Sequence, residues 1–478
     1  MKRLFFLCLL FATMGCSKKY GYDFKNGFET EPKKDTVTMD LDTSMYKVDR
    51  SQYTQARVFP GMMDVTEPRL KDYKITLNLA YMQVRSGDLR VSVTPQPYFS
   101  TGLFAPAGEL LTIDVPEGIY GLQANVGAHT DNLAGVSPLK RAEIIYTRTQ
   151  LFPGRNYIRN LYGGTIWIIA ARSLDKTVTL NVSGAAKSAD FVLGETTDAD
   201  WLEQVKKTTV PWLELRGKRM VLTIPKDRLQ RYPLESPTLL MQEWDKVIAL
   251  DYNQWLGLSD TATDIRHLAP QLPWRIVMDV QPVVGYAHSG FPVVCMMDDN
   301  WFRQITSADA LTHGANWGAF HEIGHNMQQG GVWSWPELGE VSNNLYSFKV
   351  DKRNGIRRGN FNTAIAIGLP FAATVSATKK YADLTDLTGR LAPFIQIFEK
   401  YGYGFFTELH IRARNARFTS INTQDKVDFF YECLCDYTTK DMEPFMNAWG
   451  LYISNISKGK MSAKYPLLTE QVWKYDPR

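Results

Sequence analysis

The sequence predicts a multidomain fold: a β-rich, sandwich-like N-terminal domain, then an α+β domain with a helical C-terminal part. First, 478 residues are too many for one ordinary hydrophobic core, and the hydrophobic content of 44% is that of a globular protein. Second, strand-like segments dominate residues 36–195, and strands alternate with helices in residues 196–360. Third, residues 361–478 have a mainly helical pattern. These three ranges are the predicted domains.

The first residues combine a positive start, an apolar stretch and a cysteine. Lys2 and Arg3 precede apolar residues 4–14, which are too few to span a bilayer because a spanning helix needs about 20. The stretch ends in "ATMGC", which resembles the lipobox of a bacterial lipoprotein. We therefore expect residues 1–15 to be a signal peptide and Cys16 to be lipidated. The alternative is an ordinary secretory signal.

Residues 16–35 are polar and rich in Gly, Lys and Glu, which predicts a tether at the membrane. The expected location is the outer membrane or cell surface, with the periplasmic face also open. Five cysteines are few for an exported protein, so the fold should depend on its core and not on disulfides. Cys433 and Cys435 are too close to pair readily, and we expect them to be buried on a helix.

Apolar runs rich in Val, Ile and Thr, separated by Gly, Pro and Asn, define the expected strands of the first domain. They are "YKITLNLAYM", "LRVSVTP", "ELLTIDVPEGIYGLQANV", "GTIWIIAA" and "KTVTLNVSG". Later strands are "RMVLTIP" and "PWRIVMDV", and later helices are "SPTLLMQEWDKVIALDYNQWLG", "LTGRLAPFIQIFEKYG" and "QDKVDFFYECLCDYTT". The charge of +4 is spread over 54 basic and 50 acidic side chains without a long basic run, so nucleic acid is not an expected partner.

Two of only seven histidines stand four residues apart in "HEIGH". On a helix, this spacing places His321 and His325 on one face, one turn apart, where they can share a metal ion. Zn²⁺ accepts imidazole nitrogen and prefers four ligands. Glu322 is rotated by about 100° from His321, so it can act on a metal-bound water without being a ligand. We expect Gly330 and Gly331 to end this helix with residues that tolerate positive φ.

Two histidines leave a zinc site short of a ligand, so the chain must return with a carboxylate. Glu337 follows a proline in a predicted turn, whereas Glu340 opens "EVSNNLYSF", a predicted helix. That geometry favours Glu340, with Asn343 and Asn344 on its face as supporting partners. A chance HExxH match is the alternative, and the scarcity of histidine argues against it.

"HEIGHNMQ", followed by Glu340 in "GEVSNNLYS", resembles the enhancin-like zinc metallopeptidases, the mucin-degrading peptidases of family M-sixty. Similar segments are "PWLELRGKRMVLTIPKD", "VGYAHSGFPVV", "MEPFMNAWGLYIS" and, at the end of the β domain, "IYGLQANVGAHTDN", so the resemblance covers residues 95–460. It implies a gluzincin-type zinc metallopeptidase domain. One Zn²⁺ per chain would be held by His321, His325 and Glu340, with Glu322 as the catalytic acid and base.

The expected function is a zinc-dependent endopeptidase acting on glycoproteins. The resemblance alone implies that these are mucin-type O-glycosylated proteins. The expected partners are this substrate and, through the N-terminal lipid, a membrane; the chain is expected to be a monomer. One alternative is a surface glycan- or mucin-binding lipoprotein with a non-catalytic peptidase-like domain. Another is a zinc aminopeptidase of a different gluzincin type.

The group that stabilises the oxyanion is not evident from sequence. His288, His313 and Tyr346 are candidates, each with a purely structural role as its alternative. Trp333 and Trp335 lie in the loop between the two ligand segments. Their rings could stack on substrate sugars, or they could pin the loop by packing in the core.

Overall fold

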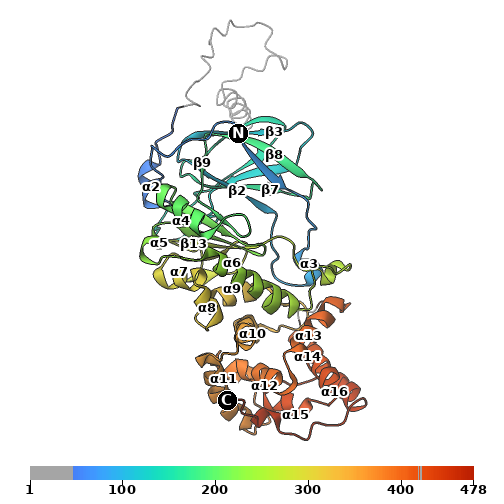
Figure 1. The fold of residues 1–478 in the computed structure, drawn as a ribbon. Helices are drawn as coiled ribbons and strands as arrows, with labels where there is room; N and C mark the ends of the chain where they lie inside the picture. Colours follow the sequence, from blue (N-terminus) through green and yellow to red (C-terminus); the bar gives the residue numbers. More distant parts are fainter. Residues whose placement is uncertain (1–46, 418, 420–421) are drawn as a thin grey trace, which may run out of the picture. The chain divides into compact units, whose positions relative to one another are not determined.

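A computed structural model describes residues 47–417, 419 and 422–478 (Figure 1). The predicted signal peptide (residues 1–15), Cys16 and the predicted tether (residues 16–35) lie outside the described residues. Residues 48–478 form one compact unit. Within the part of the chain that is described, no helix combines the length and apolarity needed to cross a membrane.

Two antiparallel sheets form the N-terminal part, which is β-rich as predicted. The four-stranded sheet has the order β1 (Tyr73–Asn78), β8 (Thr177–Ser183), β3 (Leu110–Val115) and β6 (Gly154–Arg159). The five-stranded sheet has the order β5 (Thr147–Leu151), β4 (Leu122–Val126), β7 (Gly164–Ala170), β2 (Tyr98–Ala105) and β9 (Ala186–Lys187). Ile113 and Leu180 of the first sheet share one hydrophobic core with Ala124 and Ile168 of the second. The two sheets therefore pack face to face, as in a sandwich.

One predicted strand is wrong. Residues 89–95, "LRVSVTP", form no strand: Leu89 ends the short helix α3 (Ser86–Leu89), and residues 90–95 are irregular up to β2. The short helix α2 (Tyr53–Val58) lies earlier, before β1. The apolar alternation arises because Val91 and Val93 pack against the large hydrophobic core that contains Trp274, Phe320 and Leu434. The backbone N–H of Val93 donates to the carbonyl of Asn326, which fastens the segment to the end of another element.

A six-stranded mixed sheet follows, which agrees with the predicted α+β domain. Its order is β10 (Phe191–Val192), β11 (Trp212–Arg216), β12 (Met220–Pro225), β13 (Trp274–Asp279), β15 (Val293–Met296) and β14 (Ala287–His288). Its helices are α4 (Asp198–Lys207), α5 (Arg228–Arg231), α6 (Pro237–Lys246), the π-helix η2 (Val247–Gln254), η3 (Ile265–His267), α7 (Asp299–Thr306), α8 (Ala308–Thr312) and α9 (Gly318–Asn326). The short edge strand β14 places His288 at the border of the sheet, next to α9.

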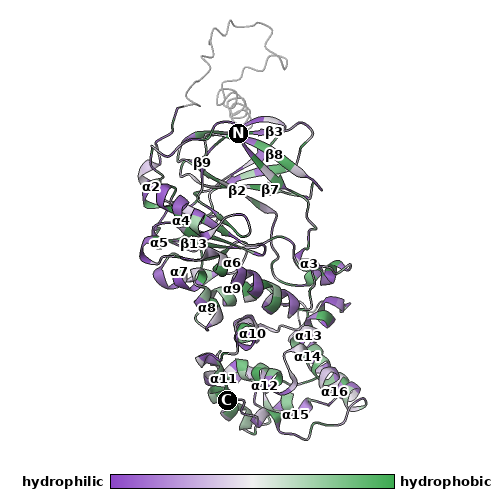
Figure 2. Ribbon diagram, in the orientation of Figure 1, coloured by the Kyte–Doolittle hydropathy of each residue, from purple (hydrophilic) through white to green (hydrophobic). Residues whose placement is uncertain are grey.

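The remaining chain is helical. Its helices are α10 (Leu345–Asn354), α11 (Gly359–Ala373), α12 (Ala392–Tyr401), α13 (Gly404–Asn415), α14 (Thr423–Thr438), α15 (Glu443–Ala448) and α16 (Asn455–Ser462), with 3₁₀ turns η6 (Tyr381–Asp383), η7 (Gly389–Leu391) and η8 (Val472–Lys474). Figure 2 shows α12 as largely hydrophobic, and residues 392–398 are all buried. Cys433 and Cys435 lie on α14 as buried free thiols, as predicted.

Buried charges join the N-terminal sheets to the six-stranded sheet. Arg141 and Asp279 form an ion pair at 2.8 Å with both side chains fully buried. Glu214 accepts hydrogen bonds from Arg275 and from the indole of Trp167. Because an unpaired buried charge is strongly destabilising, these pairs specify how the two parts meet. The first pair also anchors the loop that follows β4.

Candidate metal centre

Helix α9 carries both histidines of the motif. Its opposite face, with Ala319, Phe320 and Ile323, is buried in the core. The helix ends at Asn326, earlier than predicted. The N–H of Met327 already bonds back to the carbonyl of Gly324, and neither Gly330 nor Gly331 has a positive φ. The expected glycine stop is therefore wrong, although the helical placement of the histidines is as predicted.

Gly324 allows the returning chain to approach α9. A Cβ atom at this position would lie 2.1 Å from the carbonyl oxygen of Asn343, which belongs to the 3₁₀ turn η5 (Ser342–Asn344). Glu340 lies in the turn between η4 (Pro336–Leu338) and η5, and α10 begins only at Leu345. Glu340 is thus presented by a turn and does not open a helix as expected. The close contact between η5 and α9 puts this turn opposite the histidines.

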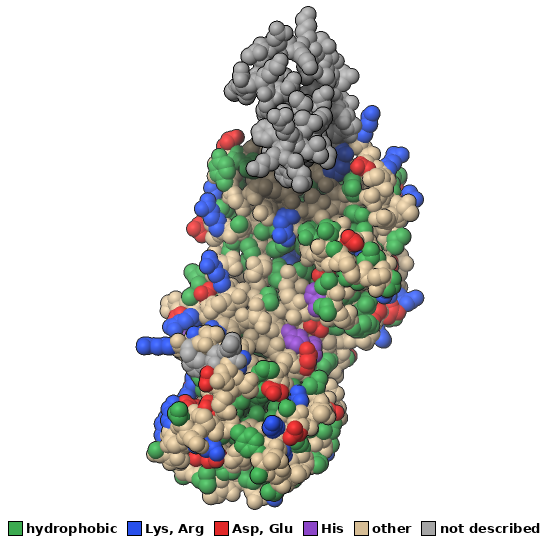
Figure 3. All heavy atoms as spheres, turned by 180° about the vertical axis from the view of Figure 1, so that it is seen from behind, with side chains coloured by type: hydrophobic (Ala, Val, Ile, Leu, Met, Phe, Trp, Pro, Cys, Tyr) green, Lys and Arg blue, Asp and Glu red, His purple; other side chains and the backbone are tan. Residues whose placement is uncertain are grey.

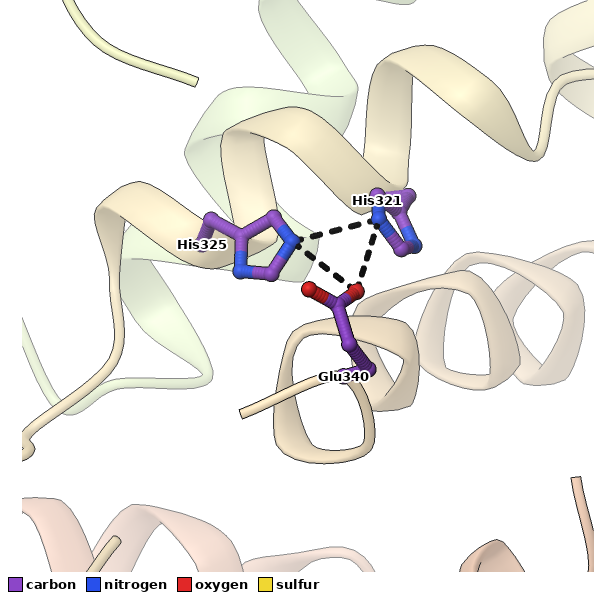
Figure 4. A group of neighbouring side chains, drawn as sticks. All are labelled: His321, His325 and Glu340. Carbon is purple, nitrogen blue, oxygen red and sulfur yellow. Dashed lines mark hydrogen bonds and ion pairs between the residues drawn. The ribbon is translucent and has the colours of Figure 1, made fainter. Parts of the chain in front are cut away.

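The structure brings His321, His325 and Glu340 together (Figure 4). The two Nε2 atoms lie 3.2 Å apart. Oε2 of Glu340 lies 3.4 Å from Nε2 of His321 and 3.3 Å from Nε2 of His325. Figure 4 shows the carboxylate pointing between the two rings. Glu337 is not part of this group.

This group fits a zinc ion. Three ligands at about 2.0–2.1 Å from a tetrahedral zinc lie about 3.3 Å from one another, close to the separations found here. Two imidazoles and one carboxylate are also a ligand set that catalytic zinc sites use. The Glu340 side chain is 55% exposed, so the cluster opens to solvent on that side. In Figure 3, histidine side chains reach the surface beside carboxylates on the face turned away in Figure 1. A fourth position is therefore accessible to water or substrate.

An amide orients each imidazole and also holds the turn that carries the glutamate. Nδ2 of Asn344 donates to the carbonyl of Glu340 at 2.9 Å, so its Oδ1 is the end that accepts from Nδ1 of His321 at 2.8 Å. An Nδ1–H donor leaves Nε2 of the same ring with a free lone pair, which is the form that binds a metal. Asn344 therefore connects His321 to the backbone of the turn that carries Glu340.

Gln328 performs the same task for His325. Its Nε2 donates to the carbonyl of Gly339 at 2.7 Å and to Oγ of Ser342 at 2.9 Å. Its Oε1 accepts from Nδ1 of His325 at 3.0 Å. Sequence reasoning foresaw Asn344 and missed Gln328, whose position three residues after His325 on the turn below the helix was the available signal. Asn343 was also foreseen as a supporting partner, but its Nδ2 lies 3.0 Å from Nε2 of His325, the nitrogen that faces Glu340, and not from Nδ1.

Glu322 is next to this cluster and only 8% exposed. Burial raises the pKa of its carboxyl group, while the nearby His321, His325 and His288 oppose that shift. Its carboxylate forms no hydrogen bond or ion pair with any residue in the described ranges. A buried carboxylate with a raised pKa and a free lone pair is suited to accept a proton at the cluster.

His288 lies at the same site and is held by both ring nitrogens. Nε2 faces Oδ2 of Asp131 at 2.9 Å, and Nδ1 faces the carbonyl of Ser289 at 2.8 Å. Burial opposes protonation, but the Asp131 carboxylate and these hydrogen bonds raise the pKa of His288 above its ordinary value. Because both neighbours are acceptors, the ring must donate from both nitrogens to satisfy them. It then keeps no N–H for an oxyanion, so its contribution here is positive charge.

Asp131 was not anticipated from the sequence. It comes from the loop after β4, where Arg141 donates to its backbone carbonyl. Its carboxylate also accepts from the backbone N–H of Val283. His129 on the same loop packs against Trp212 and bonds to Met278, and burial lowers its pKa to about 4. The only sequence signal was the position of Asp131 within "GAHTDN".

The other predicted candidates lie elsewhere. Trp333 and Trp335 are 1% and 2% exposed, so they pin the loop in the core and cannot stack on sugars. Tyr346 is fully buried and stacks on Tyr252, which removes it from the reacting groups. His313 is exposed and pairs with Asp309 on its own helix. None of these side chains contacts the metal cluster in the described structure.

Comparison with known proteins identifies the class. The model of the family "Peptidase M60, enhancin and enhancin-like" matches residues 184–450, and the model of the N-terminal domain of M60-like peptidases matches residues 69–183. The chain therefore belongs to the enhancin-like M60 peptidase family.

Two solved structures show the same fold. A ZmpB metallopeptidase from Clostridium perfringens has a TM-score of 0.69 at 18% identity, covering 85% of this chain and 84% of that chain. The M60 catalytic domain of ZmpC from the same organism, in complex with the sialyl T antigen, has a TM-score of 0.68 at 16% identity, covering 85% and 82%.

The chain is also similar to a curated protein that is not named as a peptidase. The TRPM8 channel-associated factor homolog of Danio rerio is 29% identical over 368 residues, which is 74% of this chain. The chain spans only 38% of that relative's length.

Proposed function

We propose that this chain is a zinc-dependent endopeptidase that cleaves mucin-type O-glycosylated proteins. The observation that carries the proposal is the three-residue cluster with a buried, unpartnered Glu322 beside it. Membership of the M60 peptidase family supports the reaction class. One zinc ion per chain, held by His321, His325 and Glu340, is the cofactor that this ligand set fits.

The chemistry that zinc supplies at such a site is polarisation of the scissile carbonyl and acidification of the attacking water. Glu322 accepts the proton of that water on its carboxylate and then delivers it to the nitrogen of the departing amine. The hydrogen bonds of Asn344 and Gln328 keep both histidines oriented throughout.

The positive charge of His288 adds an electrostatic contribution. The ring lies close enough to Glu322 for each to affect the pKa of the other. Asp131 keeps this ring protonated and fixed, so His288 favours negative charge developing at the site. This role differs from direct hydrogen bonding to an oxyanion. Both ring nitrogens of His288 are already bonded to Asp131 and Ser289, so the ring has no N–H left to donate to an oxyanion.

The substrate proposal has separate support. The ZmpC domain with the same fold was solved with a glycan, the sialyl T antigen, which is consistent with a glycoprotein substrate for this chain. The competing proposal is a glycan-binding protein without catalysis. It is motivated by a curated relative that is named as a channel-associated factor and not as a peptidase. The intact set of three ligands and one base argues for the enzyme.

One experiment separates these proposals. The purified protein and its Glu322→Gln variant are incubated with an O-glycosylated mucin and with the same mucin after deglycosylation. Mass spectrometry of the fragments should show chelator-sensitive cleavage of the glycosylated form by the parent protein alone. Equal cleavage by the variant would eliminate Glu322 as the base. Absence of both zinc and cleavage would favour the binding protein.

We also propose that the chain is a lipid-anchored exported protein, on the strength of "ATMGC" ending at Cys16. A Cys16→Ser variant should lose radiolabelled palmitate and leave the membrane fraction. Unchanged membrane association and labelling would contradict the anchor.

A further inference from the structure

A polar cavity of about 560 Å³ lies beside the metal-binding helix, and the reaction proposed above does not use it. Residues from five segments line it, among them Arg85, Gln96, Tyr98, Arg148 and Phe291. The volume falls in the range of small-ligand sites, which is about 300–1,000 Å³. The lining is mostly polar, with Phe291 as an aromatic element.

Two exposed arginines line this cavity. Neither Arg85 nor Arg148 forms an ion pair with a carboxylate in the described part of the chain, although many other arginines do. Arg148 is held in place by neutral groups: it donates to the hydroxyl of Tyr98 at 2.5 Å and to Oδ1 of Asn125 at 3.4 Å. Its charge is therefore oriented but not neutralised, and a guanidinium in that state is suited to a planar or tetrahedral anion.

The remaining walls match a sugar ring better than a bare ion. Nε2 of Gln96 donates to the carbonyl of Thr94, which leaves its Oε1 available to accept from a hydroxyl group. Phe291 and Tyr98 pack with ring centroids 5.6 Å apart and form an aromatic wall. A pyranose has hydroxyl groups at its edge and C–H bonds on its faces, so it uses both kinds of wall.

The cavity is structurally tied to the metal-binding helix. The carbonyl of Asn326, the residue after His325, accepts from the N–H of Val93, which precedes the cavity residues 94–98. The side chain of Asn326 exchanges two hydrogen bonds with the backbone of Gly290, next to Phe291. Two of the segments that line the cavity, those around Thr94 and Phe291, are therefore fastened to one residue at the end of α9. A substrate fixed in this cavity is held at a constant place relative to the histidines.

We propose that this cavity binds the acidic group of a carboxylated or sulfated sugar carried by the substrate. The proposal rests on the proposed glycoprotein-cleaving function and adds to it a preference for anionic glycans. Arg148 and Arg85 supply the charge, Gln96 reads a hydroxyl group, and the aromatic wall supports the ring.

Binding to the Glu322→Gln protein tests this proposal without requiring turnover. The probes are one peptide carrying a neutral galactosyl-N-acetylgalactosamine, the same glycopeptide with a terminal N-acetylneuraminic acid, and the same glycopeptide with a sulfate group. We expect at least one acidic probe to bind about tenfold tighter than the neutral one by isothermal titration calorimetry, as one charge-assisted hydrogen-bonded pair implies. The two acidic arms distinguish carboxylate from sulfate.

The arginines are then replaced in the same background as Arg85→Gln and Arg148→Gln together. The preference for the acidic probe should disappear, whereas the matched variant Arg155→Gln, whose arginine pairs with Asp114 on another sheet, should retain it. Thermal unfolding shows whether both variants are folded. Equal affinity of all probes for the parent, or a preference that survives the double replacement, would overturn the proposal. The binding assay does not depend on cleavage, so the two proposals fail in different ways. If only the peptidase proposal is wrong, the wild-type chain binds the acidic probe but does not cleave it.

Discussion

The metal centre and the arginine-lined cavity are neighbours, yet their polar groups are satisfied in opposite ways. At the metal centre, each histidine has an amide partner that also holds the Glu340 turn. In the cavity, Arg85 and Arg148 have no acidic partner in the described residues. A region whose internal bonds are complete is preorganised for chemistry, because nothing must rearrange when the reaction occurs. A region whose arginines lack acidic partners in the described residues can instead bind an anionic ligand.

The largest expected effect is the loss of turnover when Glu322 is replaced, because this residue is proposed to take part in the reaction and not in substrate binding. Glu322→Gln should lower kcat by about 10²–10⁴-fold, because it removes the proton acceptor while preserving shape. Zinc content by elemental analysis should be unchanged, since Glu322 is not a member of the ligand group. The steady-state rate on a fluorogenic glycopeptide measures the loss. A rate within a few fold of the parent would show that another group takes the proton.

Removal of a supporting amide should weaken the metal centre alone. Gln328→Ala should reduce zinc affinity by about 10–100-fold, because His325 loses its orienting partner and the Glu340 turn loses three hydrogen bonds. Competition with a chromophoric chelator measures this affinity. Gln328→Glu keeps an acceptor for His325 and loses the donors to the turn, so it separates the two contributions. Wild-type affinity in both variants would mean that Gln328 does not organise the centre.

Gly324 tests whether the close approach of η5 builds the cluster. Gly324→Ala should destabilise the protein by about 1–3 kcal/mol, because the new methyl group meets the Asn343 carbonyl, and it should weaken zinc binding as the turn moves away. Gly330→Ala is the matched control, since a Cβ there meets nothing within 4 Å. Chemical denaturation and chelator competition report the two effects. Equal behaviour of the two variants would refute the packing argument.

The smallest expected effect concerns the charge of His288. Its pKa should lie above 6.5 in the parent protein and fall in Asp131→Asn, because the neutral amide no longer favours the imidazolium. The groups facing the ring are Asp131 from the loop after β4, Glu322 from α9 and the Ser289 carbonyl. NMR titration of the ring protons, assigned with His288→Gln, measures the shift.

The sign of the pH dependence follows from the direction of this shift. A histidine whose pKa is raised by folding contributes stability that is complete below pH 6.5 and is lost as the pH rises through the raised value. The difference in unfolding free energy between the parent and Asp131→Asn should therefore shrink as the pH increases across that window. A difference that grows with pH would contradict the His288–Asp131 interaction.

Local patterns account for the parts of the site that were predicted correctly. The four-residue spacing of His321 and His325 specifies one helical face wherever the helix lies, because the helical period is a local property. Four of the five apolar runs expected in the β-rich part contain the strands β1, β3, β4, β7 and β8, whereas β2, β5, β6 and β9 were not expected from the sequence. The same reasoning failed at residues 89–95, where apolar alternation reflects packing of an unpaired segment against the core.

The sequence by itself therefore predicted that His321 and His325 share one helical face, that Glu340 returns to that face, and that the chain is β-rich and then α+β. Only the tertiary structure decided that Trp333 and Tyr346 are buried, that Asp131 meets His288 and that Gln328 holds two elements at once. It also assembled the arginine-lined cavity from five segments, residues 83–86, 94–98, 148, 169–171 and 291. The physical reason is separation along the chain: periodicity encodes the face of one helix or strand, whereas contacts between distant segments depend on how whole layers pack.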